Sequence, residues 1–508
     1  MRYKTVRVNA TPVLVRALRG RFNISPRLFV TAQFSLGDLL TRASRGWLAG
    51  MVLAACTVSR AVDAAPAWTP APYLMLDERL VAHREQVRRE LHHPSRLPEP
   101  IVTAAEDKNF QPWISVLRDP ESGRFRMWYN IPARSPDVGR SHLAYLESED
   151  GIHWLRPHRV LATAPIQFGA SVIDEGPGYA EPQKRFKAAW WKDGGLQVAA
   201  SPDGIVWTAL APGLVLRTTH DVTGIAWDPI RRRYLGLVSM TPPEFQRRRI
   251  PYESVSDDLI HWKPPWQTII PDPKAEIEKG ETQFYGLNGV IARGSLLIGV
   301  IKVLRDDLNC EPGKTAIELH DKKRPFAGLG YTVLGWSYDG EHWQRDTEPF
   351  LDRNPQPGTW DRAMTWADSQ IIVGDQLYIY YGGYRWGHKA DNYTERQIGL
   401  ARMPRDRCVA LAAGKTEGLV RTRLAKLAAA RMTVNARVSA PGGQLRVRIL
   451  DEAAKPYAGF DWDDAVPVQG DRVDHPIKWK GNLADLRDKP VQFEFKLAEA
   501  ELYSFDLR

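Results

Sequence analysis

Between residues 101 and 412, short apolar runs alternate with turn-forming residues in a pattern that repeats five times. Each unit has an entering apolar run, a turn, a more strongly apolar second run such as Leu377-Tyr378-Ile379-Tyr380-Tyr381, and a third run. Apolar runs this short, bounded by Gly, Asp, Pro and Asn, favour strands over helices. The entering strands are expected at residues 113–117, 170–173, 224–227, 288–291 and 369–373.

A seven-residue pattern, S-x-D-G-x-x-W, closes most of these units. It begins at Ser148, Ser201 and Ser337, and a fourth copy at Ser256 has Leu259 in place of Gly. Asp-Gly favours a tight hairpin turn, and the Trp three residues later can pack between neighbouring sheets. Because a repeat of about fifty residues in a strand-rich chain is typical of blade architectures, we predict a five-bladed β-propeller over residues 101–412.

The regions on either side of this repeat have different patterns. After residue 412, apolar and polar residues alternate, as in Leu445-Arg446-Val447-Arg448-Ile449, which predicts half-buried antiparallel strands and a β-sandwich over residues 413–508. Residues 66–100 form a Pro-rich lead-in segment, in which Asp77 to Glu90 is expected to be a short solvated helix. The charged segment 306–326 is expected to be a loop inserted in the fourth unit. The predicted fold class is therefore all-β.

Residues 1–65 have the features of an export signal. Arg42 and Arg45 precede a short apolar run from Trp47 to Ala55 that fits a signal sequence but is too short to span a membrane. Leu53-Ala54-Ala55-Cys56 resembles a bacterial lipobox, which would place a lipid on Cys56; alternatively, the small residues from Ala61 to Ala65 end in a signal-peptidase site. We expect an exported bacterial protein that is periplasmic, anchored to the outer membrane or extracellular.

Charge and cysteine content limit the other functions. The formal net charge is +9, but residues 1–65 contain ten Lys/Arg and two Asp, so the remaining chain is nearly neutral. A nucleic-acid partner is therefore not expected. Cys310 and Cys408 allow one disulfide in an oxidising compartment, and no Cys/His cluster has metal-ligand spacing, so no metal site is predicted.

Acidic residues precede several of the entering strands, which would line the central funnel of a propeller. The candidates are Asp107, Asp221, Glu281 and Asp361, with Glu106 and Glu278 as weaker neighbours. Glycoside hydrolysis needs one carboxylic acid to protonate the leaving oxygen, and one carboxylate that acts as base or nucleophile. We assign Asp221 as base or nucleophile and Glu281 as acid, with Asp361 or Asp107 orienting the substrate.

Aromatic and hydrogen-bonding residues accompany these acids. Aromatic faces stack on sugar rings, and basic or amide side chains bind hydroxyls, so we expect an oligo- or polysaccharide substrate. The candidate substrate-binding residues are His220, Tyr285, Asn288, Trp360, Arg362, Tyr384, Arg385 and His388.

The strand ends SDDLIHW and SPDGIVW resemble those of the five-bladed propeller glycosidases of families 32 and 43. This resemblance implies a sugar-processing enzyme without a catalytic cofactor, and it allows a structural calcium ion at the propeller axis, for which the sequence shows no ligand set. The W-M-N-D-P-N-G opening of family 32 is absent, so the acid roles rest on position. Two alternatives stay open: a non-catalytic carbohydrate-binding propeller, and a glycoside phosphorylase that binds phosphate through Arg362, Arg385 and His388.

Overall fold

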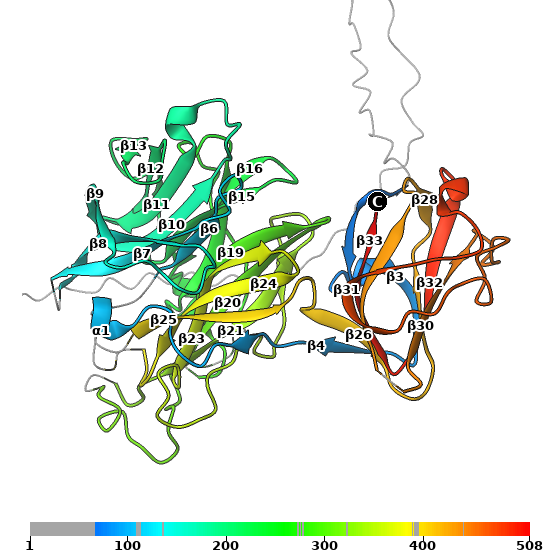
Figure 1. Ribbon diagram of the computed structural model, residues 1–508. Coiled ribbons are helices and arrows are strands. Elements are labelled where there is room, and N and C mark those ends of the chain that lie inside the picture. Colours follow the sequence, from blue (N-terminus) through cyan, green and yellow to red (C-terminus); the bar gives the residue numbers. More distant parts are fainter. Residues whose placement is uncertain are drawn as a thin grey trace, which may run out of the picture. The chain divides into compact units, whose positions relative to one another are not determined.

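The computed structural model describes residues 67–508, except 108–112, 135–136, 272–273, 275, 277–278, 322–323, 389, 391–395 and 440. The predicted export signal, including Cys56, therefore lies outside the described residues. Within the described part, almost all regular structure is β-strand, which confirms the all-β prediction (Figure 1). No helix in this part is both long and apolar enough to cross a membrane.

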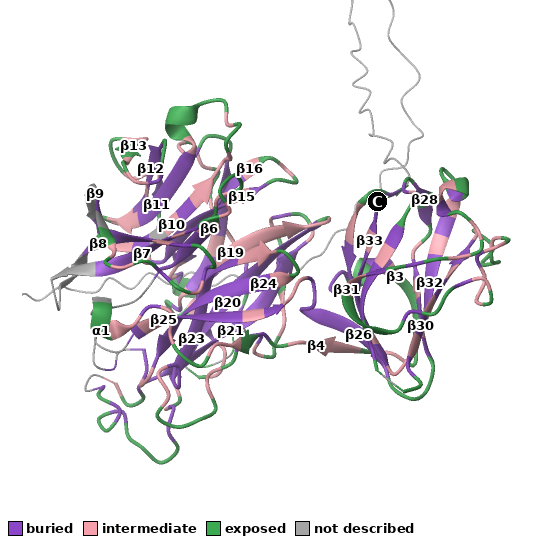
Figure 2. Ribbon diagram, viewed as in Figure 1, coloured by how far each residue is buried: buried purple, intermediate pink, exposed green. Residues whose placement is uncertain are grey.

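Five successive units of antiparallel strands follow one another between residues 115 and 404. The entering strands and the strongly apolar second strands expected from the sequence are confirmed, and the second strands are buried along most of their length (Figure 2). The units are β6 (Ser115–Arg118), β7 (Phe125–Arg134), β8 (Asp137–Ser148) and β9 (Arg159–Ile166); β10 (Phe168–Asp174), β11 (Phe186–Lys192) and β12 (Gly195–Ser201), with β13 (Thr208–Ala209) and β14 (Leu216–Arg217); β15 (Thr223–Asp228), β16 (Arg233–Met240), β17 (Ile250–Ser256) and β18 (Trp266–Gln267); β19 (Gln283–Arg293), β20 (Leu296–Arg305), β21 (Leu329–Ser337) and β22 (Trp343–Arg345); and β23 (Met364–Val373), β24 (Gln376–Tyr384) and β25 (Arg396–Pro404).

The first strands of the five units form a closed ring. Strand β6 contacts β10, β10 contacts β15, β15 contacts β19, β19 contacts β23, and β23 contacts β6 again. The hydroxyls of Ser115, Ser171 and Ser369 each accept a hydrogen bond from a backbone N–H of a neighbouring first strand, at 2.9, 2.9 and 3.2 Å. The fifth unit takes its fourth strand, β5 (Ser95–Arg96), from the chain before the first unit, because β5 pairs with β25.

The S-x-D-G-x-x-W stretches form the tight turns that the sequence predicts. In the first copy, the Ser148 hydroxyl accepts a hydrogen bond from the Gly151 backbone at 2.9 Å, and Asp150 Oδ1 accepts two more from Ile152 and His153. The same bonds recur in the other three copies. Gly151 has φ 75°, and Leu259 takes the same left-handed conformation with φ 67°.

Each closing turn packs on the preceding unit of the ring. The Tyr380 hydroxyl of the fifth unit donates to the Gly151 carbonyl of the first at 3.0 Å, and Trp128 Nε1 of the first unit donates to Gly204 of the second at 2.8 Å. Leu259 lies in an apolar cluster that includes Leu196 of the second unit, and Arg231 of the third unit donates to the Tyr338 carbonyl of the fourth. The fifth unit lacks the Trp, and here Arg293 of the fourth unit pairs with Asp406. The motif is therefore a contact between units.

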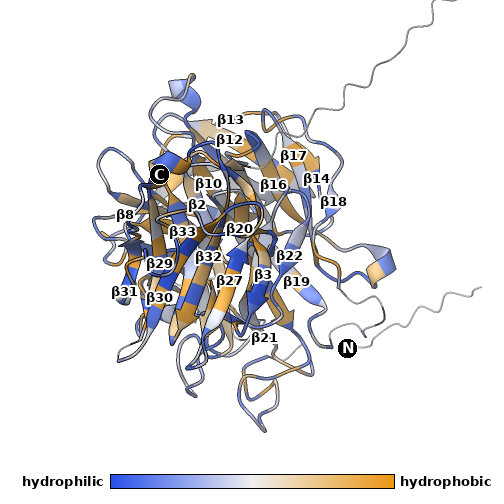
Figure 3. Ribbon diagram, turned by 90° about the vertical axis from the view of Figure 1, so that its right-hand side faces the viewer, coloured by the Kyte–Doolittle hydropathy of each residue, from blue (hydrophilic) through white to orange (hydrophobic). Residues whose placement is uncertain are grey.

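The C-terminal part contains two sheets that share one apolar core. Hydrophilic and hydrophobic residues alternate along β30 and β32 as predicted, and also along β27 (Figure 3). The strands are β26 (Val409–Ala413), β27 (Gly418–Thr422), β28 (Ala425–Leu427), β29 (Met432–Val438), β30 (Gln444–Leu450), β31 (Gly470–Pro476), β32 (Pro490–Ala498) and β33 (Ala500–Leu507). The segment before the first unit adds β1 (Ala67–Trp68), β2 (Ala71–Leu74), β3 (Val81–Glu85) and β4 (Arg88–Leu91) to these same sheets.

The prediction of a helix from Asp77 to Glu90 is wrong. Only the single 3₁₀ turn η1 (Glu78–Leu80) is helical, and the rest of the segment forms β3 and β4, which pair with β27 and β26. Both are edge strands of their sheets, where charged side chains are favoured because they oppose pairing with other chains. The charges that indicate a solvated helix in the sequence therefore belong to solvated strand edges.

The insertion expected at residues 306–326 is confirmed, since its described residues contain no helix or strand. Cys310 and Cys408 are both buried and both free, so the disulfide that the sequence allows is not formed.

Candidate active site

Residues of the third, fourth and fifth units meet around the ring of Tyr285 on β19: His220 precedes β15, Trp366 lies on β23, and His388 follows β24. Ring centroids of Trp366, His388 and His220 lie 4.7, 4.7 and 5.5 Å from that of Tyr285. Tyr285 is 4% exposed, and burial raises the pKa of its hydroxyl well above the usual value, so the phenol stays protonated. Tyr285 is therefore the buried centre of this aromatic group and cannot act as a base.

A network of polar side chains lies beside the Tyr285 ring. Arg249 Nε donates to His220 Nε2 at 3.0 Å, and Arg249 Nη1 donates to Gln283 Oε1 at 2.6 Å. The amide nitrogen of Gln283 then donates to Asp306 Oδ2 at 3.0 Å, and Asp306 also pairs with Arg324. The Arg249 guanidinium is 4.9 Å from the centre of the Tyr285 ring, a cation–π contact. The guanidinium is thus fixed in position by three contacts.

Asp221 is the acid that this arrangement leaves accessible. Its side chain is 35% exposed, compared with 4% for Asp306 and 1% for Asp321. Its Oδ1 lies 3.2 Å from His220 Nε2. When that nitrogen accepts the hydrogen bond from Arg249, it carries no proton and cannot also donate to Asp221. The carboxylate is therefore available to a ligand.

A narrow cavity lies on the axis of the ring and is lined by the first strands of all five units. Its volume of about 30 Å³ has room for about two water molecules, which is too little for a sugar ring. Asn288 Nδ2 donates to Asp368 Oδ1 at 3.1 Å, and Lys302 forms an ion pair with the same carboxylate. Burial raises the pKa of Asp368, and Lys302 opposes this shift. The axial cavity is therefore too small to hold a sugar ring.

Glu281, the second member of the predicted carboxylate pair, is held by two partners from its own unit. The Tyr331 hydroxyl donates to Glu281 Oε1 at 2.5 Å, and Arg345 Nη1 lies 2.7 Å from Glu281 Oε2. Tyr331 and Arg345 belong to β21 and β22, the outer strands of the fourth unit. Glu281 is therefore engaged in the packing of that unit.

Asp361 is also a structural residue in this fold. Its side chain is fully buried and accepts hydrogen bonds from Arg96 Nη1 and from the Tyr381 hydroxyl, both at 3.0 Å. Its neighbour Trp360 stacks on Tyr381, and Arg362 pairs with Glu311 of the insertion. Neither the predicted acid role of Asp361 nor the substrate-binding roles of Trp360 and Arg362 fit these contacts.

The other predicted residues have mixed positions. Asp107 ends the short helix α1 (Ala104–Asp107), but its side chain and residues 108–112 are outside the described part, as is Glu278. The buried ring of Tyr384 lies under the Arg396 guanidinium, and Arg385 lies over Trp386. His220, Tyr285 and His388 do come together, whereas Asn288 lines the axial cavity.

Four members of the group were not singled out from the sequence: Arg249, Gln283, Asp306 and Trp366. Gln283 and Trp366 belong to the entering strands β19 and β23, where a search for polar and aromatic residues on those strands would have found them. Arg249 precedes the third strand of its unit and Asp306 follows a second strand, positions that carry no local signal.

Comparisons with known proteins give a likeness of fold only. No protein-family model matches the chain, and no curated protein matches it. A glycosyl hydrolase from Bacteroides ovatus covers 63% of this chain with 95% of its own length, at 14% identity and a TM-score of 0.41. A structure described under glycoside hydrolase family 130, "mannoside phosphorylases" that include hydrolases of β-1,2 mannosidic linkages, covers 62% with 95% of its length, at 13% identity and a TM-score of 0.39. A family 32 β-fructofuranosidase from Bombyx mori covers 80% with 95% of its length, at 10% identity and a TM-score of 0.37. At these values the likeness carries no conclusion about activity.

Proposed function

We propose that the five units are the blades of a five-bladed β-propeller and that the two C-terminal sheets form a β-sandwich. The closed series of contacts among β6, β10, β15, β19 and β23 supports the propeller, since radial repetition of small antiparallel sheets brings the first strands together at one axis. The shared apolar core of the two C-terminal sheets supports the sandwich.

We propose further that the protein processes glycans, with Asp221 as its general acid or base. The observation that carries this proposal is the partly exposed carboxylate of Asp221, which lies beside His220, the Arg249 guanidinium and the buried ring of Tyr285. Such a carboxylate can exchange a proton with a glycosidic oxygen or a water molecule. Arg249 and the surrounding rings hold its neighbour His220 in place.

Hydrolysis by the usual two-carboxylate route requires a second acid. Because Glu281 and Asp361 are engaged in packing, the candidate that remains is Asp107 in the lead-in to the first blade. In this scheme one of the two acids protonates the leaving oxygen. The other activates water or attacks the anomeric carbon, and the separation of the two decides between inversion and retention.

Substitution of Asp221 tests this proposal directly. The full chain is assayed against a panel of oligosaccharides with plant and microbial linkages, as the parent, as Asp221→Asn and as Asp193→Asn. Asp193 is an exposed turn acid, 66% accessible, at a positive φ that Asn tolerates, so it is a matched control. We expect D221N to lower kcat by about 10²–10⁴-fold with unchanged thermal stability, and D193N to match the parent.

Two results would contradict the assignment. Parental turnover in D221N would show that Asp221 is not the acid or base. Binding of a glycan by the parent without turnover of any member of the panel would favour the non-catalytic binding propeller.

Phosphorolysis is a second candidate function, favoured by the same site. Phosphate supplies the nucleophile in that reaction, so a single acid beside a guanidinium is sufficient, and Arg249 is the guanidinium that the structure holds near Asp221 through His220. The earlier candidate Arg362 is occupied by Glu311. Turnover that depends on inorganic phosphate, and that Arg249→Lys weakens through KM for phosphate, would favour phosphorolysis over hydrolysis.

We also propose that the protein is exported through its first 65 residues, with Cys56 as the lipid-bearing residue. The basic residues, the short apolar run and the small residues before Cys56 support this proposal. Fractionation of a Gram-negative host tests it, because Cys56→Ser should move the protein from the membrane fraction to the soluble fraction. An unchanged distribution would favour the alternative cleavage site after Ala65.

A further inference from the structure

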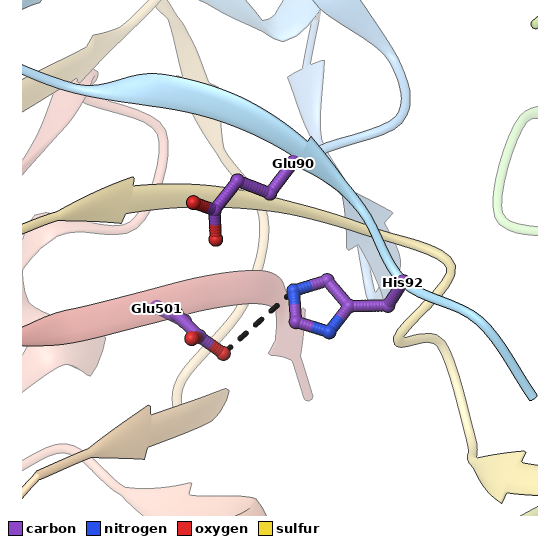
Figure 4. A group of neighbouring side chains, drawn as sticks. All are labelled: Glu90, His92 and Glu501. Atoms are coloured by element: carbon purple, nitrogen blue, oxygen red, sulfur yellow. Dashed lines mark ion pairs between the residues drawn. The ribbon is translucent and has the colours of Figure 1, made fainter. Parts of the chain in front are cut away.

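Three potential metal ligands converge on the polar side of one C-terminal sheet. They are Glu90 on β4, His92 directly after β4, and Glu501 on β33, and each offers a ligand atom within 4.8 Å of the others (Figure 4). None of them belongs to the candidate active site. The residues come from opposite ends of the chain, so their spacing in the sequence gives no sign of a site.

Strand β26, which lies between β4 and β33, explains how the three side chains come together. Strands β4 and β33 both pair with β26, on opposite sides, with Glu90 opposite Ala410 and Glu501 opposite Ala412. Directly paired residues point to the same face of a sheet. Because alanine side chains are short, they leave space above β26 into which the longer side chains of its neighbours extend. Both alanines are almost fully buried beneath that space.

His92 is prepared to act as a ligand. Its Nε2 is buried and makes no hydrogen bond within the described residues, and it lies 3.7 Å from Glu501 Oε2, which is too long for a hydrogen bond. Burial lowers the pKa of the imidazole, although Glu501 and Glu90 oppose this shift. A buried imidazole nitrogen that makes no hydrogen bond can donate its lone pair to a metal ion.

Both glutamates are held in position by charged partners. Arg437 pairs with Glu501 Oε1, and the Tyr503 hydroxyl donates to Glu501 Oε2. These contacts, with Arg437 as the main charge, lower the pKa of Glu501 against the effect of burial. Glu90 pairs with the exposed Arg88. Partners of this kind orient metal-binding carboxylates, and the two arginines also reduce the net negative charge that a cation would meet.

We propose that Glu90, His92 and Glu501 bind one divalent transition-metal ion, with zinc as the best match. Zinc accepts one imidazole and two carboxylates at about 2.0–2.2 Å, and a water molecule completes the tetrahedron. Ligand atoms of such a tetrahedron lie about 3.3 Å apart, so the 3.7 Å contact needs only a small rotation of the side chains. Calcium and magnesium prefer oxygen-only sites, which makes the imidazole a selective element.

The bound ion would connect the N-terminal strand β4 to the C-terminal strand β33. Binding to the folded state alone stabilises it, so zinc should raise the unfolding temperature of the chain by mass action. This role is independent of glycan processing, and its test needs no enzyme assay.

The test is a titration of the chelator-treated full chain with zinc chloride in a non-chelating buffer at pH 7.5, followed calorimetrically. The parent, His92→Ala and Glu501→Gln are compared with His83→Ala, a matched control in which an exposed histidine of β3 is removed. We expect the parent and H83A to bind one equivalent of zinc at this site. Both site variants should weaken that binding by more than about tenfold and abolish the zinc-dependent rise in Tm.

The outcome that overturns the proposal is equally definite. If H92A, shown to be folded by its zinc-free Tm, binds zinc with the parent's stoichiometry and affinity, the ion binds elsewhere. If the parent binds no zinc up to millimolar concentration, the three residues form only an ion-pair network with Arg88 and Arg437.

Discussion

Glu253 should make the stability of this protein fall as the pH rises. The residue lies on β17, is 0% exposed, and accepts a hydrogen bond from Trp343 Nε1 of the next unit at 2.7 Å. Burial raises the pKa of its carboxyl group to about 8, although Trp343 and Arg233 oppose the shift. In the unfolded chain the same group has an ordinary pKa near 4.5. At neutral pH the folded state therefore holds a proton that the unfolded state has lost.

The sign and size of the effect follow from these two values. Because the folded-state pKa is the higher one, the full stabilisation is present below about pH 4.5 and is lost as the pH rises toward 8. Each pKa unit corresponds to about 1.4 kcal/mol, so the contribution of Glu253 falls by about 3 to 4 kcal/mol between pH 5 and pH 8. Since other groups titrate in the same range, the informative quantity is the difference between the parent and a neutral variant.

Glu253→Gln provides that variant, since its amide oxygen can still accept the Trp343 hydrogen bond. Urea unfolding is measured from pH 5 to pH 8 for the parent, for E253Q and for Glu149→Gln, a control at an acid that is 70% exposed. The stability of E253Q relative to the parent should rise by about 3 kcal/mol across this range, and E149Q should show no such trend. A difference between E253Q and the parent that stays constant with pH would refute the assignment of a raised pKa to Glu253.

Three further perturbations have definite expected outcomes. Gly204→Ala should lower the stability measured by thermal unfolding by about 1–3 kcal/mol, because φ is +75° and the added Cβ would lie 2.8 Å from a Trp128 ring atom. Gly178→Ala, whose Cβ would meet nothing within 4 Å, should leave the stability unchanged, and equal effects of the two substitutions would contradict the packing role of the turns. Asp361→Asn should destabilise by about 3–5 kcal/mol through its buried ion pair with Arg96, while activity per folded molecule on any glycan substrate is retained; loss of turnover with normal stability would restore Asp361 as a catalytic candidate. Peptide mapping with a thiol reagent should find Cys310 and Cys408 unreactive until the protein unfolds, because burial raises the pKa values of their thiols to about 11 and about 12. Labelling of either cysteine in the native state would contradict their burial.

The strands could be predicted because their signals are local. Apolar runs and Asp-Gly turns place each strand within a few residues, and the turn beginning at Ser148 contains its own hydrogen bonds. The prediction for the segment from Asp77 to Glu90 failed because its structure depends on pairing with β26 and β27, which lie more than three hundred positions away in the sequence. Local propensity cannot distinguish a charged edge strand from a charged helix when the pairing partner is this remote.

The candidate site could be predicted only in part, for a related reason. Position before an entering strand led to His220 and Asp221, and it led in the same way to Glu281 and Asp361, which are held by partners of their own. What separates these acids is whether an arginine from another element reaches them. Arg345 reaches Glu281, and Arg96 reaches Asp361 across more than 250 positions of the chain. Partners of this kind are a property of the packed fold, and no spacing rule identifies them.

The strands contributed by residues 67–96 have a consequence for how the molecule is assembled and divided. Strands β1 to β4 complete the sheets of the C-terminal part, and β5 completes the fifth unit, so the five units are inserted in the sequence between strands of the two C-terminal sheets. A fragment that begins at residue 413 would lack four strands of its sheets as well as β26, and one that spans residues 101–412 would leave an open edge on β25. During synthesis, β1 to β4 can pair only after their C-terminal partner strands have been made. Truncated or chimeric versions of the protein should therefore keep residues 67–96 together with the C-terminal strands.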